Sequence, residues 1–136
     1  MAIMVHTGGG ARAYNYNAAN AFIHIHEDGK THVLVGVSEH GQGARTTLAQ
    51  IVAEELGISP QNIRIAETDT DVNPMDMGAF ASRTTYVLGN AVLSAAADVK
   101  RQIFDTAAGV LEANPDDLMI RNEMVFVKGS FETSIS

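Results

Sequence analysis

Ser38-Glu39-His40-Gly41-Gln42-Gly43 organises the chain, because it joins a segment with strand periodicity to one with helical periodicity. A glycine on each side of Gln42 lets the backbone come very close to a bound molecule. The loop also opens a helix, whose free N–H groups and positive dipole end favour an anionic or acceptor-rich ligand. Taken alone, a Gly-x-Gly at such a junction is as typical of a tight turn, and that alternative stays open.

Before this loop, aliphatic side chains occupy every second position on both sides of a Glu27-Asp28-Gly29 turn, which is the period of a half-buried strand. A three-residue connection with its glycine in the left-handed conformation pairs like faces and gives a hairpin with a glycine bulge. This register predicts that Ile23 faces Val33 and that His24 faces His32. The aliphatic positions are Ala21, Ile23, Ile25, Val33, Val35 and Val37.

Two helices are predicted after the loop. In the first, Ala44–Leu56, the apolar residues fall on one face, and Gly57 is the expected stop. The second begins with Ser82 as its N-cap and runs to about residue 113, before Pro115. Its glycines and alanines make it narrow enough for close packing. The bulkier contacts are expected from Val92, Val99, Ile103 and Val110.

The remaining segments are a long acidic loop over 67–83 and short strands at 62–66, Leu118–Arg121 and Met124–Val127, the last two around an Asn122-Glu123 turn. A loop of that length in a small domain is usually functional. We therefore expect one α+β domain over residues 1–136, with a β-hairpin, two helices of which the second is long, and short mixed-sheet strands. The expected order is β-β-α-β-α-β-β.

Composition excludes several classes of protein. The 136 residues are 46% hydrophobic with a formal charge of -7, and no basic stripe is present to neutralise phosphates, so nucleic acid is not an expected partner. No apolar run approaches the roughly 20 residues that span a bilayer, and the start lacks a secretory signal. Without cysteine the chain has no disulfide and no thiolate metal or iron–sulfur site. A cytoplasmic location is the default expectation.

The five histidines are candidate metal ligands. His24, His26 and His32 gather on the hairpin face opposite the aliphatic one, and histidines two apart on a strand can bind zinc. No carboxylate pattern accompanies them, so a solvated or partner-facing surface is favoured. His40 could orient the glycine loop, cap the helix or lie in solvent, and His6 has no predicted place.

The acidic loop and the N-terminal glycines offer weaker signals. Asp69, Asp71 and Asp76 could bind a cation, but they lack the spacing of a calcium loop, so a solvated loop is favoured and no metal ligand is predicted. Gly8-Gly9-Gly10 is expected to form a flexible or ligand-approaching turn.

Two loops, 38–43 and 78–85, each precede a predicted helix and carry small residues or hydroxyls. If the helices pack side by side, these loops form neighbouring anion-friendly concavities. Their amide, hydroxyl and guanidinium groups suit a phosphate plus a heterocycle, although two ordinary capped helices remain the alternative. The groups are those of Gln42, Ser82, Arg83, Thr84 and Thr85.

These residues resemble a known family. Val37-Ser38-Glu39-His40-Gly41-Gln42-Gly43-Ala44-Arg45-Thr46-Thr47-Leu48-Ala49-Gln50-Ile51 is similar to a signature of the molybdopterin-binding subunits of the xanthine oxidase family. Further matching segments follow in order over roughly residues 21–129. Ala81-Ser82-Arg83 resembles the corresponding segment in a bacterial branch of the family, which uses molybdopterin cytosine dinucleotide. This branch includes 4-hydroxybenzoyl-CoA reductase and carbon monoxide dehydrogenase. The further segments are Glu67-Thr68-Asp69-Thr70, Pro74, Ala81-Ser82-Arg83-Thr84-Thr85 and Gly89-Asn90-Ala91-Val92.

The resemblance implies a cofactor site. Gly41, Gln42 and Gly43 would lie against the pterin and the molybdenum centre, with the Gln42 amide hydrogen-bonded to the cofactor. Phe80 would border the substrate pocket. FAD and iron–sulfur clusters would be carried by partner subunits, and the remainder of the molybdopterin subunit would complete the site. Backbone and hydroxyl contacts to the cofactor would come from Ala81, Ser82, Arg83, Thr84 and Thr85.

The chain also departs from the family pattern. Large subunits of this family carry a Gly-Glu-Pro-like motif whose glutamate is the catalytic base, and no such motif occurs here. We therefore expect a middle section of a molybdenum-cofactor-binding domain, with no catalytic residue and no activity alone. Its hairpin and alanine-rich helix would expose apolar faces and self-associate. The alternatives are a freestanding binding or assembly module that shares the fold, and an unrelated small enzyme acting through His40 and the acidic loop.

Overall fold

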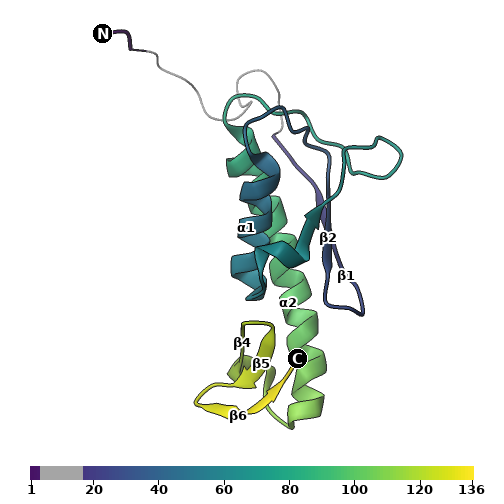
Figure 1. Ribbon diagram of the computed structural model, residues 1–136, viewed down its shortest axis with the longest axis vertical. Coiled ribbons are helices and arrows are strands. Elements are labelled where there is room, and N and C mark those ends of the chain that lie inside the picture. The colour runs from purple at the N-terminus through teal and green to yellow at the C-terminus, as the bar shows by residue number, and fades with distance from the viewer. Residues whose placement is uncertain (4–16) are drawn as a thin grey trace.

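Two three-stranded sheets pack at different levels along one long helix, α2 (Figure 1). The computed structural model describes residues 1–3 and 17–136, so His6 and the Gly8-Gly9-Gly10 turn lie outside the described residues. The predicted α+β class and element order are confirmed, with one strand, β6, in addition. The elements are β1 (Ala21–Ile25), β2 (Thr31–Val35), α1 (Ala44–Leu56), η1 (Pro60–Asn62), β3 (Ile63–Ile65), η2 (Thr84–Leu88), α2 (Gly89–Leu111), η3 (Pro115–Asp117), β4 (Leu118–Arg121), β5 (Met124–Val127) and β6 (Ser130–Ile135).

The predicted hairpin and its register are confirmed. β1 and β2 are antiparallel, with Ile23 opposite Val33 and His24 opposite His32. Gly29 has φ 78°, and its N–H donates to the carbonyl of His26 at 2.9 Å, which closes the three-residue turn. β3 then pairs with β2 in parallel, so the first sheet is mixed.

Both helices cover the aliphatic face of this sheet, and the main core lies between them (Figure 1). Val33 and Val35 on β2 are fully buried there, whereas Ile23 and Ile25 on β1 are half-buried, so the hairpin exposes less of its aliphatic face than predicted. A Cβ added at Gly89 would come 3.2 Å from Ile51 Cδ1, which shows how closely α2 approaches α1. The prediction that Val110 makes a packing contact is wrong, because its side chain is 64% exposed. No helix in the described part of the chain is long and apolar enough to cross a membrane.

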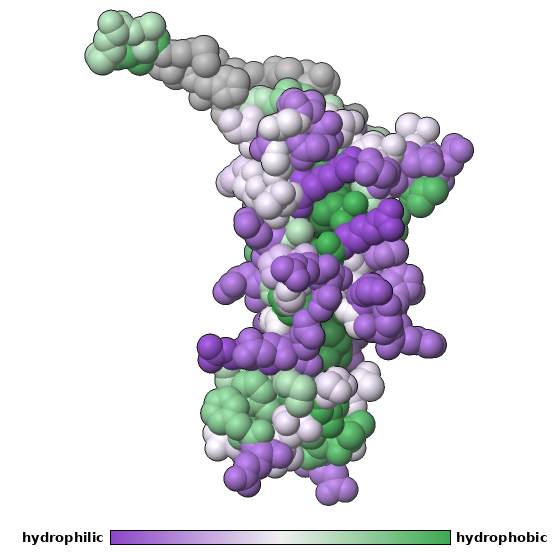
Figure 2. Space-filling view, in the orientation of Figure 1, coloured by the Kyte–Doolittle hydropathy of each residue, from purple (hydrophilic) through white to green (hydrophobic). Residues whose placement is uncertain are grey.

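The second sheet packs on the far part of α2 around Ala107, Leu118 and Val125. β4 and β5 form the predicted hairpin, and its two turn residues both have positive φ. β6 was not predicted, because Ser130–Ile135 is mostly polar and exposed and lacks an apolar alternation. Figure 2 shows hydrophobic side chains gathered over this end of the molecule, where Phe131 is 71% exposed.

The long helix does not begin as predicted. Ser82 has φ 58° and Ala81 has φ 48°, both left-handed, so Ser82 is not an N-cap. The helical backbone starts at Arg83 without a side-chain cap, and its first turn, η2, is a π-helix whose Thr84 carbonyl accepts from the Gly89 N–H. The start of the helix is instead fixed by the buried Arg83 side chain, described below.

Candidate functional site

The loops after β2 and after β3 emerge at one edge of the first sheet, because these two strands are parallel. The chain passes from β2 through α1 to β3, and then from β3 through the 66–83 loop to η2 and α2. Figure 1 shows that α1 and η2 begin at the same end of the molecule, and the two elements are in contact. Ligands of open α/β sheets bind outside the carboxyl ends of their parallel strands. The predicted juxtaposition of the two helix starts is therefore present.

Gln42 closes its own loop. Its Oε1 accepts from the His40 N–H at 2.8 Å, and its Nε2 donates to the Ser38 carbonyl at 3.0 Å. Gly41 and Gly43 flank it with φ 98° and 77°, values that glycine adopts without strain. The side chain is exposed, and its amide has one further N–H to offer.

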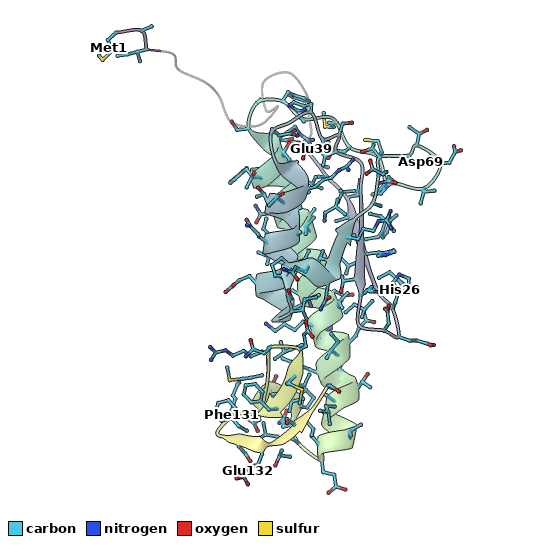
Figure 3. The ribbon with its side chains drawn as sticks, in the orientation of Figure 1. Met1, His26, Glu39, Asp69, Phe131 and Glu132 are labelled. Atoms are coloured by element: carbon cyan, nitrogen blue, oxygen red, sulfur yellow. The ribbon has the colours of Figure 1, made fainter. Side chains whose placement is uncertain are left out.

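Glu39 occupies the start of α1. Its Oε1 accepts from the Gly41 and Gly43 N–H groups at 2.9 and 3.0 Å, and its Oε2 accepts from the Arg45 N–H at 3.2 Å. These backbone bonds, that from Arg45 first, hold the pKa of Glu39 below its ordinary value. Figure 3 shows Glu39 at this end of the molecule. The N–H groups that the sequence suggested for an external anion are therefore bonded to the chain's own carboxylate.

The acidic loop is fastened to the end of β2. The Thr68 hydroxyl donates to the Val37 carbonyl at 2.9 Å, and Asn73 Nδ2 donates to the Val35 carbonyl at 2.6 Å. A Cβ added at Gly36 would lie 2.3 Å from the Pro74 carbonyl oxygen, so only glycine lets the loop cross here. The loop is packed at its base, and the exposed part lies around Asp69, which Figure 3 shows projecting away from the sheet.

Arg83 is the buried centre of the second loop. Its Nη1 donates to Asp76 Oδ1 at 2.7 Å and to the Gly78 carbonyl at 3.0 Å. Its Nε donates to Asn17 Oδ1 and its Nη2 to the Ala18 carbonyl. Neither member of the Asp76 pair has exposed side-chain surface. The sequence predicts that the Arg83 guanidinium binds a ligand. This prediction is wrong, because the guanidinium is bonded to groups of its own chain.

Around Arg83, the predicted contact residues lie at the surface. The Phe80 ring centroid is 5.7 Å from the guanidinium carbon, and Ser82 and Thr85 are exposed. Among the described residues, the hydroxyls of Ser82, Thr84 and Thr85 have no hydrogen-bond partner. The beginning of η2 therefore offers unpaired hydroxyl groups, whereas the beginning of α1 is filled by Glu39.

Three of the candidate metal ligands lie together on the hairpin. His24, His26 and His32 contact each other edge to face, with ring centroids 4.5 Å apart for each neighbouring pair. Yet no group of three side chains within residues 1–3 and 17–136 has the geometry to hold a metal ion. Asp69 and Asp71 are exposed as predicted.

Sequence reasoning missed three residues that shape the site. The sequence predicts that Asp76 lies in a solvated loop, but its side chain is buried against Arg83. Glu39 received no role, although a carboxylate four residues before the helix N-cap could have been tested as a capping group. Asn17 gave no signal, because only the fold brings it to Arg83.

Comparison with known proteins gives a consistent result. The whole chain, residues 1–136, matches the molybdopterin cofactor-binding domain family. It is 42% identical over 108 residues to the 6-hydroxypseudooxynicotine dehydrogenase complex subunit gamma of Paenarthrobacter nicotinovorans, covering 79% of this chain and 14% of that protein. It is 39% identical over 107 residues to the carbon monoxide dehydrogenase large chain of Hydrogenophaga pseudoflava, covering 79% of this chain and 13% of that one.

The fold is also similar to solved structures. Quinoline 2-oxidoreductase from Pseudomonas putida 86 superposes with a TM-score of 0.84 at 29% identity, over 96% of this chain and 17% of that chain. The chain therefore spans less than a fifth of the length of the relatives it matches.

Proposed function

The chain belongs to the xanthine oxidase family as a molybdopterin cofactor-binding domain, and on this premise we propose that loops 38–43 and 80–85 together hold the cofactor. One observation carries the proposal: two helix starts with different chemistry lie at the same edge of one sheet. The first offers the Gln42 amide on a loop whose backbone N–H groups bind the Glu39 carboxylate, and the second offers the hydroxyls of Ser82, Thr84 and Thr85, which bond to no side chain or carbonyl of the described residues.

The donor set fits a cofactor with a pterin and a phosphate. The remaining Gln42 N–H and the close backbone of Gly41 and Gly43 suit the polar edge of a heterocycle. Ser82, Thr84 and Thr85 suit phosphate oxygens, because hydroxyls and the free N–H groups of a helix start bind anions. Ala81 and Arg83 would contribute backbone, since the Arg83 fork is buried. Phe80, 36% exposed at the same loop, would border the substrate pocket.

The relatives support a proposal for the form of the cofactor and for the surrounding assembly. We assign molybdopterin cytosine dinucleotide, because a carbon monoxide dehydrogenase large chain is among the relatives and Ala81-Ser82-Arg83 is similar to that branch. When bound, the group supplies a two-electron redox centre. The remainder of the molybdopterin subunit, and iron–sulfur and flavin subunits with FAD, would complete a cytoplasmic enzyme. This chain alone is expected to be inactive, because its sequence holds no Gly-Glu-Pro-like motif, and to self-associate through exposed apolar side chains such as Phe131.

A freestanding binding or assembly module remains the second candidate. Fully buried side chains such as Leu48, Val52 and Val92 give the chain a hydrophobic core. Such a module would fold as a monomer and carry no pterin.

Cofactor content decides between the two. The full-length molybdopterin subunit that carries these residues is produced in a bacterial host that makes molybdopterin dinucleotides, and molybdenum is measured by mass spectrometry and pterin by fluorescence after oxidation. We expect both in the wild-type subunit, and about a tenfold weaker retention in Gln42→Ala, the effect of one lost hydrogen bond of about 1.4 kcal/mol. Gln50→Ala, an exposed glutamine of α1, the helix that follows the loop, is the matched control. A wild-type subunit free of pterin would refute the proposal.

A further inference from the structure

Glu39 binds the N–H groups that a helix start would otherwise present to an anion. Its two oxygens accept from three backbone donors, those of Gly41, Gly43 and Arg45, at 2.9 to 3.2 Å. Three such bonds place one carboxylate at the positive end of α1, where negative charge is most favourable. The loop therefore carries its own anion.

The Arg45 side chain pairs with another carboxylate. The Arg45 guanidinium makes two hydrogen bonds of 2.5 Å to the carboxylate of Glu67, one from each terminal nitrogen. Glu39 is thus held by backbone groups and keeps its negative charge beside the loop. The lowered pKa of Glu39, caused first by the Arg45 N–H bond, agrees with a carboxylate that stays ionised.

Gln42 depends on the same carboxylate. The two glycines bonded to Glu39 are the direct neighbours of Gln42, so their positions set the backbone from which its amide projects. The Gln42 bonds to the His40 N–H and the Ser38 carbonyl close the same loop.

We infer that Glu39 is a positioning residue: it holds the Gly41–Gly43 loop in the shape that binds the cofactor and excludes phosphate from the start of α1. This inference rests on the proposed function for its ligand, and on the hydrogen bonds alone for the shape of the loop. It follows that the Gly41–Gly43 loop would contact an uncharged polar edge of the cofactor, and that the phosphate would bind away from the start of α1.

The experiment uses amide NMR on the chain without cofactor. In Glu39→Ala, we expect the Gly41, Gly43 and Arg45 amides to exchange at least about tenfold faster with solvent, since each loses a hydrogen bond. Inorganic phosphate is expected to shift these amides in the variant and not in the wild type. Added acetate is expected to restore their protection, because a free carboxylate can refill the site. A merely structural residue would give neither the phosphate response nor the acetate rescue.

Two further variants keep the result decisive. Glu39→Gln keeps the shape and loses the charge, so it is expected to fold and to show an intermediate phosphate response. Glu54 is an exposed glutamate of α1, and Glu54→Ala is expected to behave as the wild type. Protected amides and no phosphate response in both Glu39 variants would overturn the inference, as would the same response in Glu54→Ala.

Cofactor loading of the full-length molybdopterin subunit separates this inference from the proposed function. If the wild-type subunit retains pterin and its Glu39→Ala variant retains about tenfold less, both stand. If the wild type retains pterin and Glu39→Ala retains as much, the inference fails and the proposed function stands. If the wild type retains none, the proposed function fails, and the amide measurements still decide the role of Glu39 in the loop.

Discussion

Replacing Arg83 with methionine perturbs the buried centre of the 76–83 loop. The Arg83 guanidinium lies 2.7 Å from the Asp76 carboxylate, and neither side chain has exposed surface. Methionine keeps much of the apolar stem but removes the bonds to Asp76, Gly78, Asn17 and Ala18. The Asp76 carboxylate would then stay buried, with the Gly78 N–H as its donor among the described residues.

We expect Arg83→Met to lower the free energy of unfolding by about 3–5 kcal/mol, because removing one partner leaves an uncompensated buried charge. Asp76→Asn is expected to cost about 3 kcal/mol, because it leaves the buried Arg83 guanidinium without a countercharge, although the amide oxygen still accepts a hydrogen bond. The double variant should cost less than the sum of the two, with a coupling of about 1–3 kcal/mol. Urea unfolding followed by circular dichroism measures all four free energies of the cycle.

Arg64→Met is the matched control, since Arg64 is exposed on β3 and its loss should change the free energy of unfolding by no more than about 0.5 kcal/mol. The reasoning is refuted if Arg83→Met costs less than about 1 kcal/mol, or if the two single costs simply add. Either result would mean that Arg83 does not act through Asp76.

Three more predictions concern stability. Gly36→Ala should destabilise by about 3 kcal/mol in urea unfolding, because its Cβ would meet the Pro74 carbonyl at 2.3 Å, and a neutral result would contradict the loop path. Gly109→Ala should stabilise by about 0.5–1 kcal/mol, because it lies in an exposed helix turn with nothing within 4 Å, and a loss of stability would be unexpected. Partial burial, and then His26, lower the pKa of His32. The unfolded state therefore binds more protons, so the melting temperature should fall as pH drops below about 6.5, and less so in His32→Gln.

Much of the fold could be predicted because its signals are local. The period-2 alternation and Gly29 determined the hairpin register, and Gly57 stops α1 in the left-handed conformation, with its N–H donating to Ala53. β6 could not be predicted in this way, because its residues are mostly polar and the strand exists only through pairing with β5. The prediction that Ser82 caps the long helix is wrong for a related reason. The next residue, Arg83, makes buried contacts with residues distant in sequence, and these override the local capping preference of serine.

The candidate site was predictable at the level of loops and not of side chains. Loop 38–43 could be recognised from its two glycines, and the parallel pairing of β2 with β3 brings it to the same edge as the second loop. The fate of each polar group could not be read from the chain. Whether a backbone N–H at the helix start is free or already bonded depends on the side-chain conformation of a nearby carboxylate such as Glu39. The sequence gives neither that conformation nor the resulting distances.

Two helix starts with equal dipoles would compete for the same anionic group, and a ligand with one phosphate end and one neutral end could then bind in either direction. On the proposed function, Glu39 at the start of α1 would remove that ambiguity, because its negative charge would oppose phosphate there, whereas the start of η2 has no side-chain cap among the described residues. The buried Arg83 would serve the start of η2 differently, since it fixes the backbone of the loop without placing its own charge at the surface. The orientation of the ligand would then depend on where charge is neutralised inside the protein as much as on where donors are exposed.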